Sequence, residues 1–326
     1  MKRTLHNLSL LFCLAVAVLA SCVYEDEVPC PCGVRLVYDM NMEFADAFSA
    51  QVDDVTLLIF DAEGRYLDTR TAQGLLGRAG GSRMELGDLP VGTYQLLAWA
   101  GLCNEAAPYA LLPAPPVPGE TTLSQLMLRL EGLERGEYGE PLTDVWHGLL
   151  TDFTVTGHSP AEGTIRLTKD TNRFRILVQT AGQAMHAADY RLGISAANAC
   201  LGWDNRPTQG AEVVYRPYVQ TEEAIEDAEG GTAVTALAAE MATLRLMADG
   251  QQRFTVENIT RGETVMDIDL IRYLDLMRLD EHAAMPLQEF LDRENTWNII
   301  LLMGSDGHLL TIQINAWILV LNQTEL

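Results

Sequence analysis

Four consecutive residues near the amino end, Leu19-Ala20-Ser21-Cys22, have the types and order that a covalent lipid modification requires. They close a short apolar run that begins at Leu8 and follows two basic residues. A basic start, a short apolar core and small residues at the cut site are typical of a secretory signal peptide. The branched residue, the two small residues and the cysteine form the lipobox pattern of bacterial lipoproteins. The pattern predicts that residues 1–21 are removed as a signal peptide and that the Cys22 thiol receives a diacylglycerol.

The predicted attachment to a membrane depends on lipid alone. The apolar run is shorter than the roughly 20 residues that a transmembrane helix needs. Each buried CH₂ contributes about 0.8 kcal/mol, and two lipid signals already give stable attachment. We expect 22–32 to be a lipidated tether, whose acidic residues 23–27 are either a solvated spacer or a signal for surface export. The alternative is an ordinary secretion signal in which Cys22 is present by chance.

Charge excludes one large class of partner. Without residues 1–21 the chain keeps 45 acidic and 20 basic side chains, a formal charge of −25. Such a charge repels nucleic acid and anionic membrane surfaces, so we expect no nucleic-acid partner. Hydrophobic residues make up 48% of the sequence, enough for packed cores. The remaining 305 residues are a length that suggests two domains.

The cysteines suggest structural roles. Cys30, Cys32, Cys103 and Cys200 remain beside the lipid site, in a compartment where disulfides persist. Four thiols allow three pairings, and sequence alone does not choose among them. Cys30 and Cys32 resemble half of a metal site, but no second cysteine pair or close histidine pair completes it. We favour a disulfide or unpaired structural thiols and expect no metal.

The patterns that could support catalysis are weak. Gly157-His158-Ser159-Pro160-Ala161 lacks the closing glycine of a serine nucleophile elbow and lies in an expected linker. Asp267 and Asp269 are two residues apart, so on a helix they diverge. Four aromatic residues could stack on a sugar, although core positions are the commoner use: Tyr94, Trp99, Trp297 and Trp317. We therefore predict no catalytic residues, no cofactor and no small-molecule substrate.

The first half of the sequence has the pattern of β-strands joined by turns. Alternating apolar residues predict a half-buried strand over 34–40. The run 55–60, a turn and the run 65–70 predict a hairpin. Pro90 and Gly92 predict a tight turn before a strand at 95–100, as in transthyretin-like sandwiches. The proline-rich stretch 111–118 is expected to be an exposed linker or an extended crossing.

Glycine, serine and proline cluster at 157–163, where we place a boundary between domains at 33–157 and 158–326. The second half restarts with a strand at 174–178, followed by candidates at 190–196 and 213–218. Apolar residues recur every three or four positions over 266–279, which predicts a helix. Pro286 favours the start of a second helix over 287–294. The runs 297–303 and 310–321 predict a closing hairpin.

Several of these segments resemble the FimB-like family, the anchor and accessory-subunit lipoproteins of type V fimbriae. The lipobox and the turn and strand at Leu89–Trp99 carry the resemblance in the amino half. Five elements carry it in the carboxyl half: Ile165–Arg173, Asp269–Leu276, Gln288–Glu294, Trp297 and Ile314–Trp317. The string Gln288–Glu294 is the most specific of them.

The resemblance implies a mainly β fold of two transthyretin-like β-sandwich domains in tandem, with short helices in the second. It also implies a non-enzymatic role at the outer membrane, with fimbrial structural subunits as partners. An exposed sandwich edge can accept or donate a strand, and 310–321 is either such a strand or an ordinary internal one. The alternative function is that of a surface adhesin that binds glycans or host protein.

Overall fold

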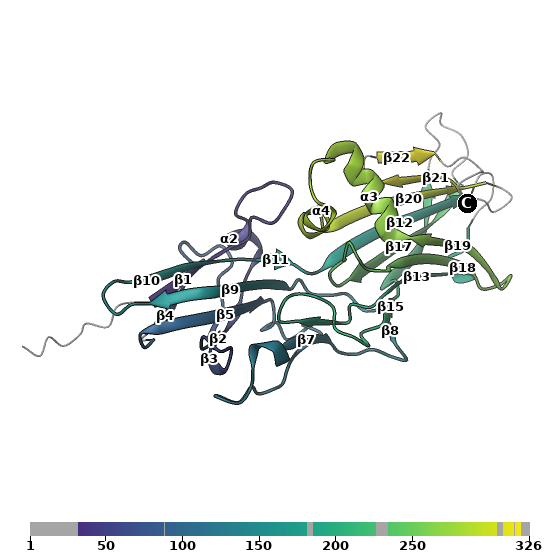
Figure 1. Ribbon diagram of the computed structural model, residues 1–326. Coiled ribbons are helices and arrows are strands. Elements are labelled where there is room, and N and C mark those ends of the chain that lie inside the picture. The colour runs from purple at the N-terminus through teal and green to yellow at the C-terminus, as the bar shows by residue number, and fades with distance from the viewer. Residues whose placement is uncertain are drawn as a thin grey trace, which may run out of the picture.

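The computed structural model describes residues 32–87, 89–180, 185–225, 234–304, 309–315 and 317–320. Strands dominate this part of the chain, and they form five sheets accompanied by three short α-helices. The prediction of a mainly β fold with short helices in the second half is confirmed. Figure 1 shows an elongated molecule with the amino-terminal sheets on one side and the carboxyl-terminal sheets and helices on the other.

Two sheets face each other in the amino-terminal half. The smaller sheet has the order β10-β1-β4, with β1 between a parallel and an antiparallel neighbour. The larger has the order β11-β9-β5-β2-β3. Their strands are β1 (Cys32–Val37), β2 (Val55–Phe60), β3 (Tyr66–Ala72), β4 (Arg83–Gly87), β5 (Gly92–Ala100), β9 (Trp146–Val155), β10 (Ala161–Arg166) and β11 (Thr168–Lys169). The hairpin predicted over 55–70 is the antiparallel pair of β2 and β3.

Strand β2 of the larger sheet is buried on both faces. Leu57 and Ile59 point into the core shared with the smaller sheet. Their neighbours Leu58 and Phe60 point the other way, into a core that continues to the carboxyl end. A strand covered on both sides has a continuous apolar sequence instead of an alternating one, which is the pattern of Val55–Phe60.

The carboxyl-terminal half contains a six-stranded sheet of order β16-β17-β12-β20-β21-β22 and a five-stranded sheet of order β19-β18-β13-β15-β8. The first is formed by β12 (Asn172–Thr180), β16 (Val219–Ile225), β17 (Val234–Thr243), β20 (Thr296–Met303), β21 (Leu309–Ile314) and β22 (Trp317–Val320). The second is formed by β8 (Glu137–Tyr138), β13 (Tyr190–Ala196), β15 (Val213–Tyr215), β18 (Arg253–Asn258) and β19 (Glu263–Asp269).

Some strands of the first half complete sheets of the second. A three-stranded sheet joins β6 (Tyr109–Leu112) and β7 (Met127–Leu130) to β14 (Cys200–Gly202), and β8 pairs with β15. Residues 156–160 form the turn from β9 into β10, residues 161–163 begin β10, and β10 pairs with β1. After β10 and β11 the chain continues into β12 of the six-stranded sheet, and the domain boundary between 157 and 158 stays a prediction. The sequence did not reveal the pairing of β10 with β1, because the other strands of that sheet lie far earlier in the chain.

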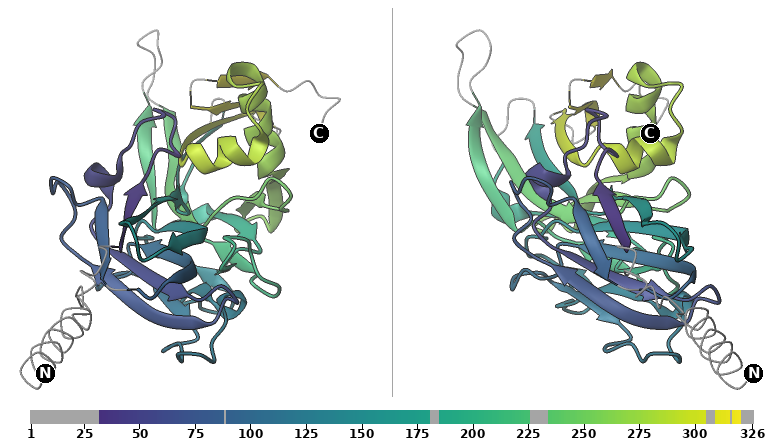
Figure 2. Two further views of the ribbon diagram at one scale, coloured as in Figure 1. Left: turned by 60° about the vertical axis from the view of Figure 1, so that its left-hand side comes forward. Right: turned by 90° about the vertical axis from the view of Figure 1, so that its left-hand side faces the viewer.

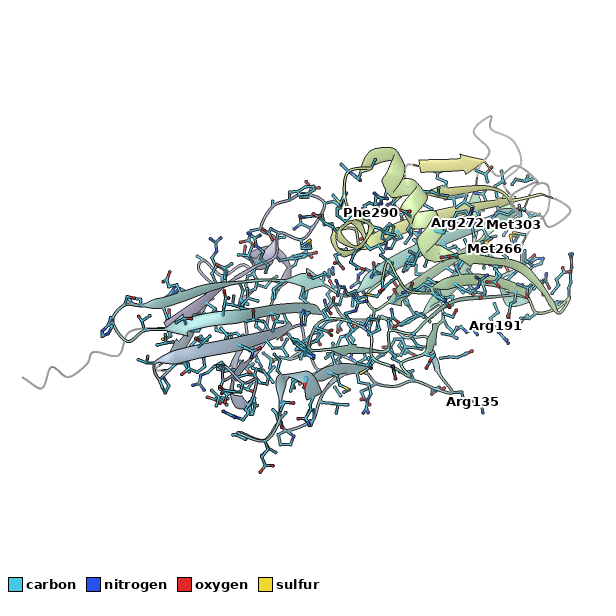
Figure 3. All side chains as sticks on the ribbon, viewed as in Figure 1. Arg135, Arg191, Met266, Arg272, Phe290 and Met303 are labelled. Atoms are coloured by element: carbon cyan, nitrogen blue, oxygen red, sulfur yellow. The ribbon has the colours of Figure 1, made fainter. Side chains whose placement is uncertain are left out.

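The helices are α2 (Phe48–Gln51), α3 (Leu270–Glu281) and α4 (Leu287–Arg293). Helix α3 begins later than the predicted 266, because Met266 belongs to β19 and the Asp269 carboxylate caps the helix by accepting the Arg272 N–H. Helix α4 follows Pro286 as predicted. Figure 3 shows both helices beside the carboxyl-terminal sheets, with the labelled Phe290 on α4. No helix in the described ranges is long and apolar enough to cross a membrane.

The closing segment contains two strands instead of one. Residues 310–321 were predicted as a single strand, but Asn315 has φ 51° and separates β21 from β22. Asparagine adopts this left-handed conformation more readily than most residues. As a result β21 lies inside the sheet, between β20 and β22, and β22 is an edge strand of the described sheet.

Candidate functional site: a polar junction between the two halves

Segments far apart in the sequence meet where the chain passes from β11 to β12. They are 165–173, the helix α4 and Trp297 at the start of β20, three of the segments that carry the family resemblance. Asn172 connects two of them, because its Oδ1 accepts a hydrogen bond of 3.0 Å from the Trp297 Nε1–H. Both residues are almost fully buried. The junction is therefore an interior polar network and not an open cleft.

An arginine lies at the centre of this network. Arg245 donates through Nε and Nη2 to the two carboxylate oxygens of Asp292, each at 2.8 Å, and through Nη1 to the Asn205 carbonyl. The side chains of Arg245 and Asp292 are only 12% and 10% exposed. Two parallel charge-assisted bonds fix both the distance and the angle between the partners. The pair thus joins the segment after β17 to α4.

Asp170 is a second carboxyl group in the junction and is fully buried. Its Oδ1 accepts a 2.8 Å hydrogen bond from Asn205 Nδ2 and lies 3.9 Å from Arg245 Nε. Its Oδ2 makes no hydrogen bond in the described structure, and neither does Asn205 Oδ1. Burial raises the pKa of Asp170 to about 7, although Arg245 and Asn205 oppose the shift. Asp170 is therefore about half protonated near pH 7 and neutral well below it.

His147 is buried next to this network. Its Nε2 donates a hydrogen bond of 2.9 Å to the Trp203 carbonyl oxygen. Its ring packs edge-on against Trp99, with 4.8 Å between the ring centroids. Burial lowers its pKa to about 4, with the carbonyl acting in the opposite direction. A neutral, fixed imidazole of this kind fills space and satisfies one carbonyl group.

Asp144 forms ion pairs with two basic residues, Lys169 of β11 and Arg173 of β12. Its carboxylate accepts from Lys169 at 2.9 Å and from Arg173 at 2.8 Å, and it also accepts the Thr171 hydroxyl. Burial, the largest influence, would raise the pKa of Asp144, but Lys169 and Arg173 together hold it below its ordinary value. The Lys169 ammonium also lies over the Trp146 ring, 5.5 Å from its centroid.

Helix α4 uses its two faces differently. Phe290 and Leu291 are buried in the carboxyl-terminal core, where Phe290 meets Trp297 edge-on at 5.9 Å. Gln288 accepts the Ala248 N–H and donates to the Leu246 carbonyl and to Asp292. The apolar residues of the string Gln288–Glu294 therefore pack inward, while Gln288 and Glu294 bind neighbouring backbone groups.

Arg293 extends the junction to the amino end of the fold. Its Nη1 donates to the backbone carbonyls of Asp39 and Asn41, at 3.0 and 3.1 Å, in the loop that follows β1. Its guanidinium also stacks over Phe44 of the same loop at 4.3 Å. Figure 2 shows this purple segment beside the yellow-green α4, from the opposite end of the sequence. The carboxyl half thus holds the segment that leads out of β1.

The residues singled out for catalysis lie apart from the junction and from one another. Ser159 and His158 are exposed in the β9–β10 turn. Asp267 pairs with Arg253 at 2.7 Å, whereas Asp269 caps α3. Among the described residues, no group of three or more His, Cys, Asp or Glu side chains could hold a metal ion.

The aromatic residues have core roles where their side chains are described. Trp99 and Trp297 are fully buried, and Tyr94 is buried with its hydroxyl donating to the Pro90 carbonyl. The Trp317 side chain lies outside the described set. Cys22 and Cys30 also lie outside the described residues, whereas Cys103 and Cys200 have free thiols there. The cysteine pairing therefore stays a prediction.

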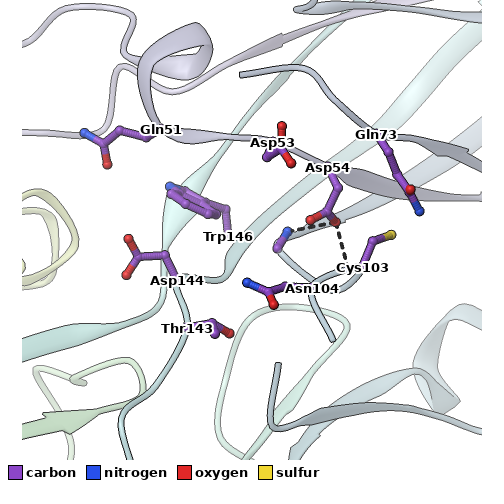
Figure 4. Close-up of a pocket in the computed structure, with 10 residues that line it drawn as sticks. Gln51, Asp53, Asp54, Gln73, Cys103, Asn104, Thr143, Asp144 and Trp146 are labelled. Carbon is purple, nitrogen blue, oxygen red and sulfur yellow. Dashed lines mark hydrogen bonds between the residues drawn. The ribbon is translucent and has the colours of Figure 1, made fainter. Parts of the chain in front are cut away.

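A surface pocket of about 260 Å³ lies at the ends of β2, β3 and β5 and the start of β9 (Figure 4). Its carboxylates are engaged within the chain: Asp54 Oδ1 accepts the N–H groups of Gly101, Leu102 and Cys103, and Asp144 holds Lys169 and Arg173. Burial raises the pKa of the Cys103 thiol, which disfavours a reactive thiolate. The rim also includes the exposed amide side chains of Gln51, Gln73 and Asn104. Of these, Asn104 accepts the Ala106 N–H through Oδ1.

A family model described as fimbrillin-A associated anchor proteins Mfa1 and Mfa2 matches residues 26–323. No curated protein matches the chain.

Solved structures resemble the chain over most of its length. A candidate adhesin from Bacteroides thetaiotaomicron is 32% identical with a TM-score of 0.79, covering 91% of this chain and 100% of its own. A structure from the same bacterium with the same values is described as a candidate polysaccharide-binding protein. The fimbrial anchor protein Mfa2 from Porphyromonas gingivalis has a TM-score of 0.69 at 16% identity, covering 90% of this chain and 99% of its own, and shares the fold.

Proposed function

Because the chain belongs to the family of fimbrillin-A associated anchor proteins, we propose that it is a lipid-anchored protein of the outer membrane that holds a fimbria to the cell surface. The observation that carries the proposal is the family match over 26–323, which includes the junction and both sets of sheets. The resemblance inferred from the sequence is confirmed by this match. The described structure is consistent with a structural role, since the motif residues bind one another instead of facing a cleft.

The membrane end of the proposal depends on Cys22. The lipobox and the short apolar run support lipidation of this thiol, after which acyl chains hold the protein in the bilayer. Residues 22–32 then act as a tether between the lipid and β1. The acidic residues of the tether support a position on the outer surface.

The fimbrial end of the proposal depends on strand pairing. An edge strand has unpaired N–H and C=O groups that a strand of another subunit can join. In the described six-stranded sheet β22 pairs with β21 alone. We assign the contact with fimbrial structural subunits to this edge.

A pull-down experiment tests the proposal. The tagged protein is isolated from detergent-solubilised outer membranes, and bound proteins are identified by mass spectrometry. Recovery of a fimbrial structural subunit is the expected result. A Cys22→Ala variant should still capture the subunit from a mixed lysate, because the proposed contact lies on the fold and not on the lipid. If neither form retains any fimbrial subunit, the anchor function is wrong.

Glycan capture is a second candidate function. It is supported by the description of one 32% identical relative as a candidate polysaccharide-binding protein and by the three amide side chains at the rim of the pocket in Figure 4. Amides donate and accept, as sugar hydroxyls do. A glycan array that gives signal with the native chain, and none with a Gln51→Ala, Gln73→Ala and Asn104→Ala triple variant, would support it.

A further inference from the structure

The strand nearest the proposed lipid anchor occupies a central place in its sheet. β1 begins ten residues after Cys22 and pairs with β10 on one side and β4 on the other. Its side chains Cys32, Val34 and Leu36 are fully buried. A fimbria pulled away from a cell loads its anchor through the amino end of this strand. The pulling force would therefore act on a strand that is held by hydrogen bonds to β10 and β4 and by its buried side chains.

Arg83 crosses the exposed face of β1. From β4 it donates through Nη1 to Glu162 of β10 at 2.7 Å and through Nε to Glu85 of its own strand at 2.8 Å. Gly33 of β1 lies underneath, and a Cβ atom at this position would be 2.9 Å from Arg83 Nη2. The glycine thus makes room for a guanidinium that joins the two neighbours of β1 over its surface.

The other end of β1 is fixed to the carboxyl half. Arg293 binds the carbonyl groups of Asp39 and Asn41, and Asn295 donates to the Tyr38 hydroxyl at 3.3 Å. The backbone N–H of Tyr38 donates to Asp46, which keeps the loop folded back on the strand. Figure 2 shows the loop and α4 side by side. A direct chain of contacts therefore runs from Cys32 through β1 to α4.

We propose that β1 is the force-bearing strand of the molecule, with Arg83 as a strap that keeps it between β4 and β10 and Arg293 as the connection that passes the load to the carboxyl half. This inference rests on the proposed anchoring function. Hydrogen bonds of a sheet run across its strands, so a pull along β1 loads the ladders on both sides together. Such an arrangement resists more force than a strand peeled from its end one bond at a time.

The strap is expected to matter little at equilibrium. Arg83, Glu85 and Glu162 are all exposed, and exposed ion pairs add little to the free energy of unfolding. Under load the same pairs must break in the step that frees β1. This difference separates a force-bearing role from a general structural one.

Single-molecule pulling tests the proposal. The full mature chain with Cys22→Ala is held through an amino-terminal tag and through a peptide tag inserted after Arg261, in the exposed β18–β19 turn. At constant load we expect Arg83→Met and Arg293→Met each to raise the rate of the first unfolding step roughly tenfold, as the loss of one charge-assisted contact in the rate-limiting step would. The melting temperature of Arg83→Met should stay close to that of the parent chain.

The control is Arg70→Met, which removes the exposed pair of Arg70 with Asp68 on the edge strand β3, outside the path. It should leave the rate under load unchanged. The proposal is overturned if Arg83→Met behaves like this control, or if the first step releases the carboxyl-terminal strands while β1 stays in place. Neither result depends on lipidation, so a failure here is separate from a failure of the anchor function.

Discussion

Arg245 and Asp292 form a two-point ion pair in the interior of the junction, with both nitrogen–oxygen distances at 2.8 Å. The two residues are 47 positions apart, and neither was singled out from the sequence as half of a pair. The contact connects α4, the most specific motif of the sequence, to the segment after β17. Because Asp292 is paired with Arg245, the charged string Gln288–Glu294 can lie against the carboxyl-terminal core.

Removing one member of this pair should be costly. Arg245→Met leaves Asp292 buried without its cation, and the expected loss in free energy of unfolding is about 3–5 kcal/mol. Urea denaturation monitored by tryptophan fluorescence measures it. A double variant, Arg245→Met with Asp292→Leu, should recover much of the loss because no charge remains unpaired. A single variant as stable as the parent chain would show that the pair is dispensable.

Phe290 is expected to be the main apolar contact of α4. Its ring is 1% exposed and packs on Trp297, so Phe290→Ala should lower the free energy of unfolding by roughly 3–5 kcal/mol. Phe44→Ala is the matched control, since that ring is 58% exposed, and it should change stability by less than about 1 kcal/mol. Similar losses in both variants would contradict the burial of α4.

Asp170 should make the protein less stable as pH rises. Its pKa is raised from 3.8 to about 7, so its contribution is fully present below pH 4 and is lost between pH 4 and pH 7, by roughly 2–4 kcal/mol. Asp170→Asn should remove this decline, because an amide stays neutral and can donate to Asn205 Oδ1. Denaturant titrations at several pH values compare the two chains. An unchanged pH profile in the variant would show that Asp170 is ionised throughout.

His147 should make the protein less stable as pH falls, which is the opposite of the effect of Asp170. Its pKa is lowered from 6.5 to about 4, so its contribution is present above pH 6.5 and is lost as pH falls toward 4. His147→Gln keeps a donor for the Trp203 carbonyl and has no charge to gain. The variant should therefore lose less stability than the parent chain when the pH is lowered from 6.5 to 4, in the same titrations. A steeper loss in the variant would exclude this assignment.

The sequence predicted local elements better than it predicted their assembly. Val55–Phe60 and Leu287–Arg293 were found because apolar spacing and proline are read within a few residues. The single strand expected over 310–321 was wrong, since the left-handed conformation of Asn315 leaves no trace in apolar alternation. The place of β10 beside β1 could not be read at all, because pairing between distant strands depends on topology.

The site shows the same division. The string Gln288–Glu294 was identified by its family resemblance, and Pro286 predicted the start of the helix that contains it. The partners Arg245 and Asn205 had no distinguishing signal, because their roles arise only when β17 and α4 are brought together. The string Ile165–Arg173 was identified by resemblance, yet the burial of Asp170 could be learned only from the fold.

The most direct test of the central claim is the amount of fimbriae that remains on cells whose protein carries Cys22→Ala. Cells with the native chain and with the variant are sheared gently, and fimbrial structural subunits are quantified in the cell pellet and the medium. A Cys103→Ala strain controls for the loss of a thiol. The account predicts that fimbriae move to the medium in the Cys22→Ala strain alone, together with the variant protein. Fimbriae that stay on the cells, with the variant protein still in the membrane fraction, would contradict it.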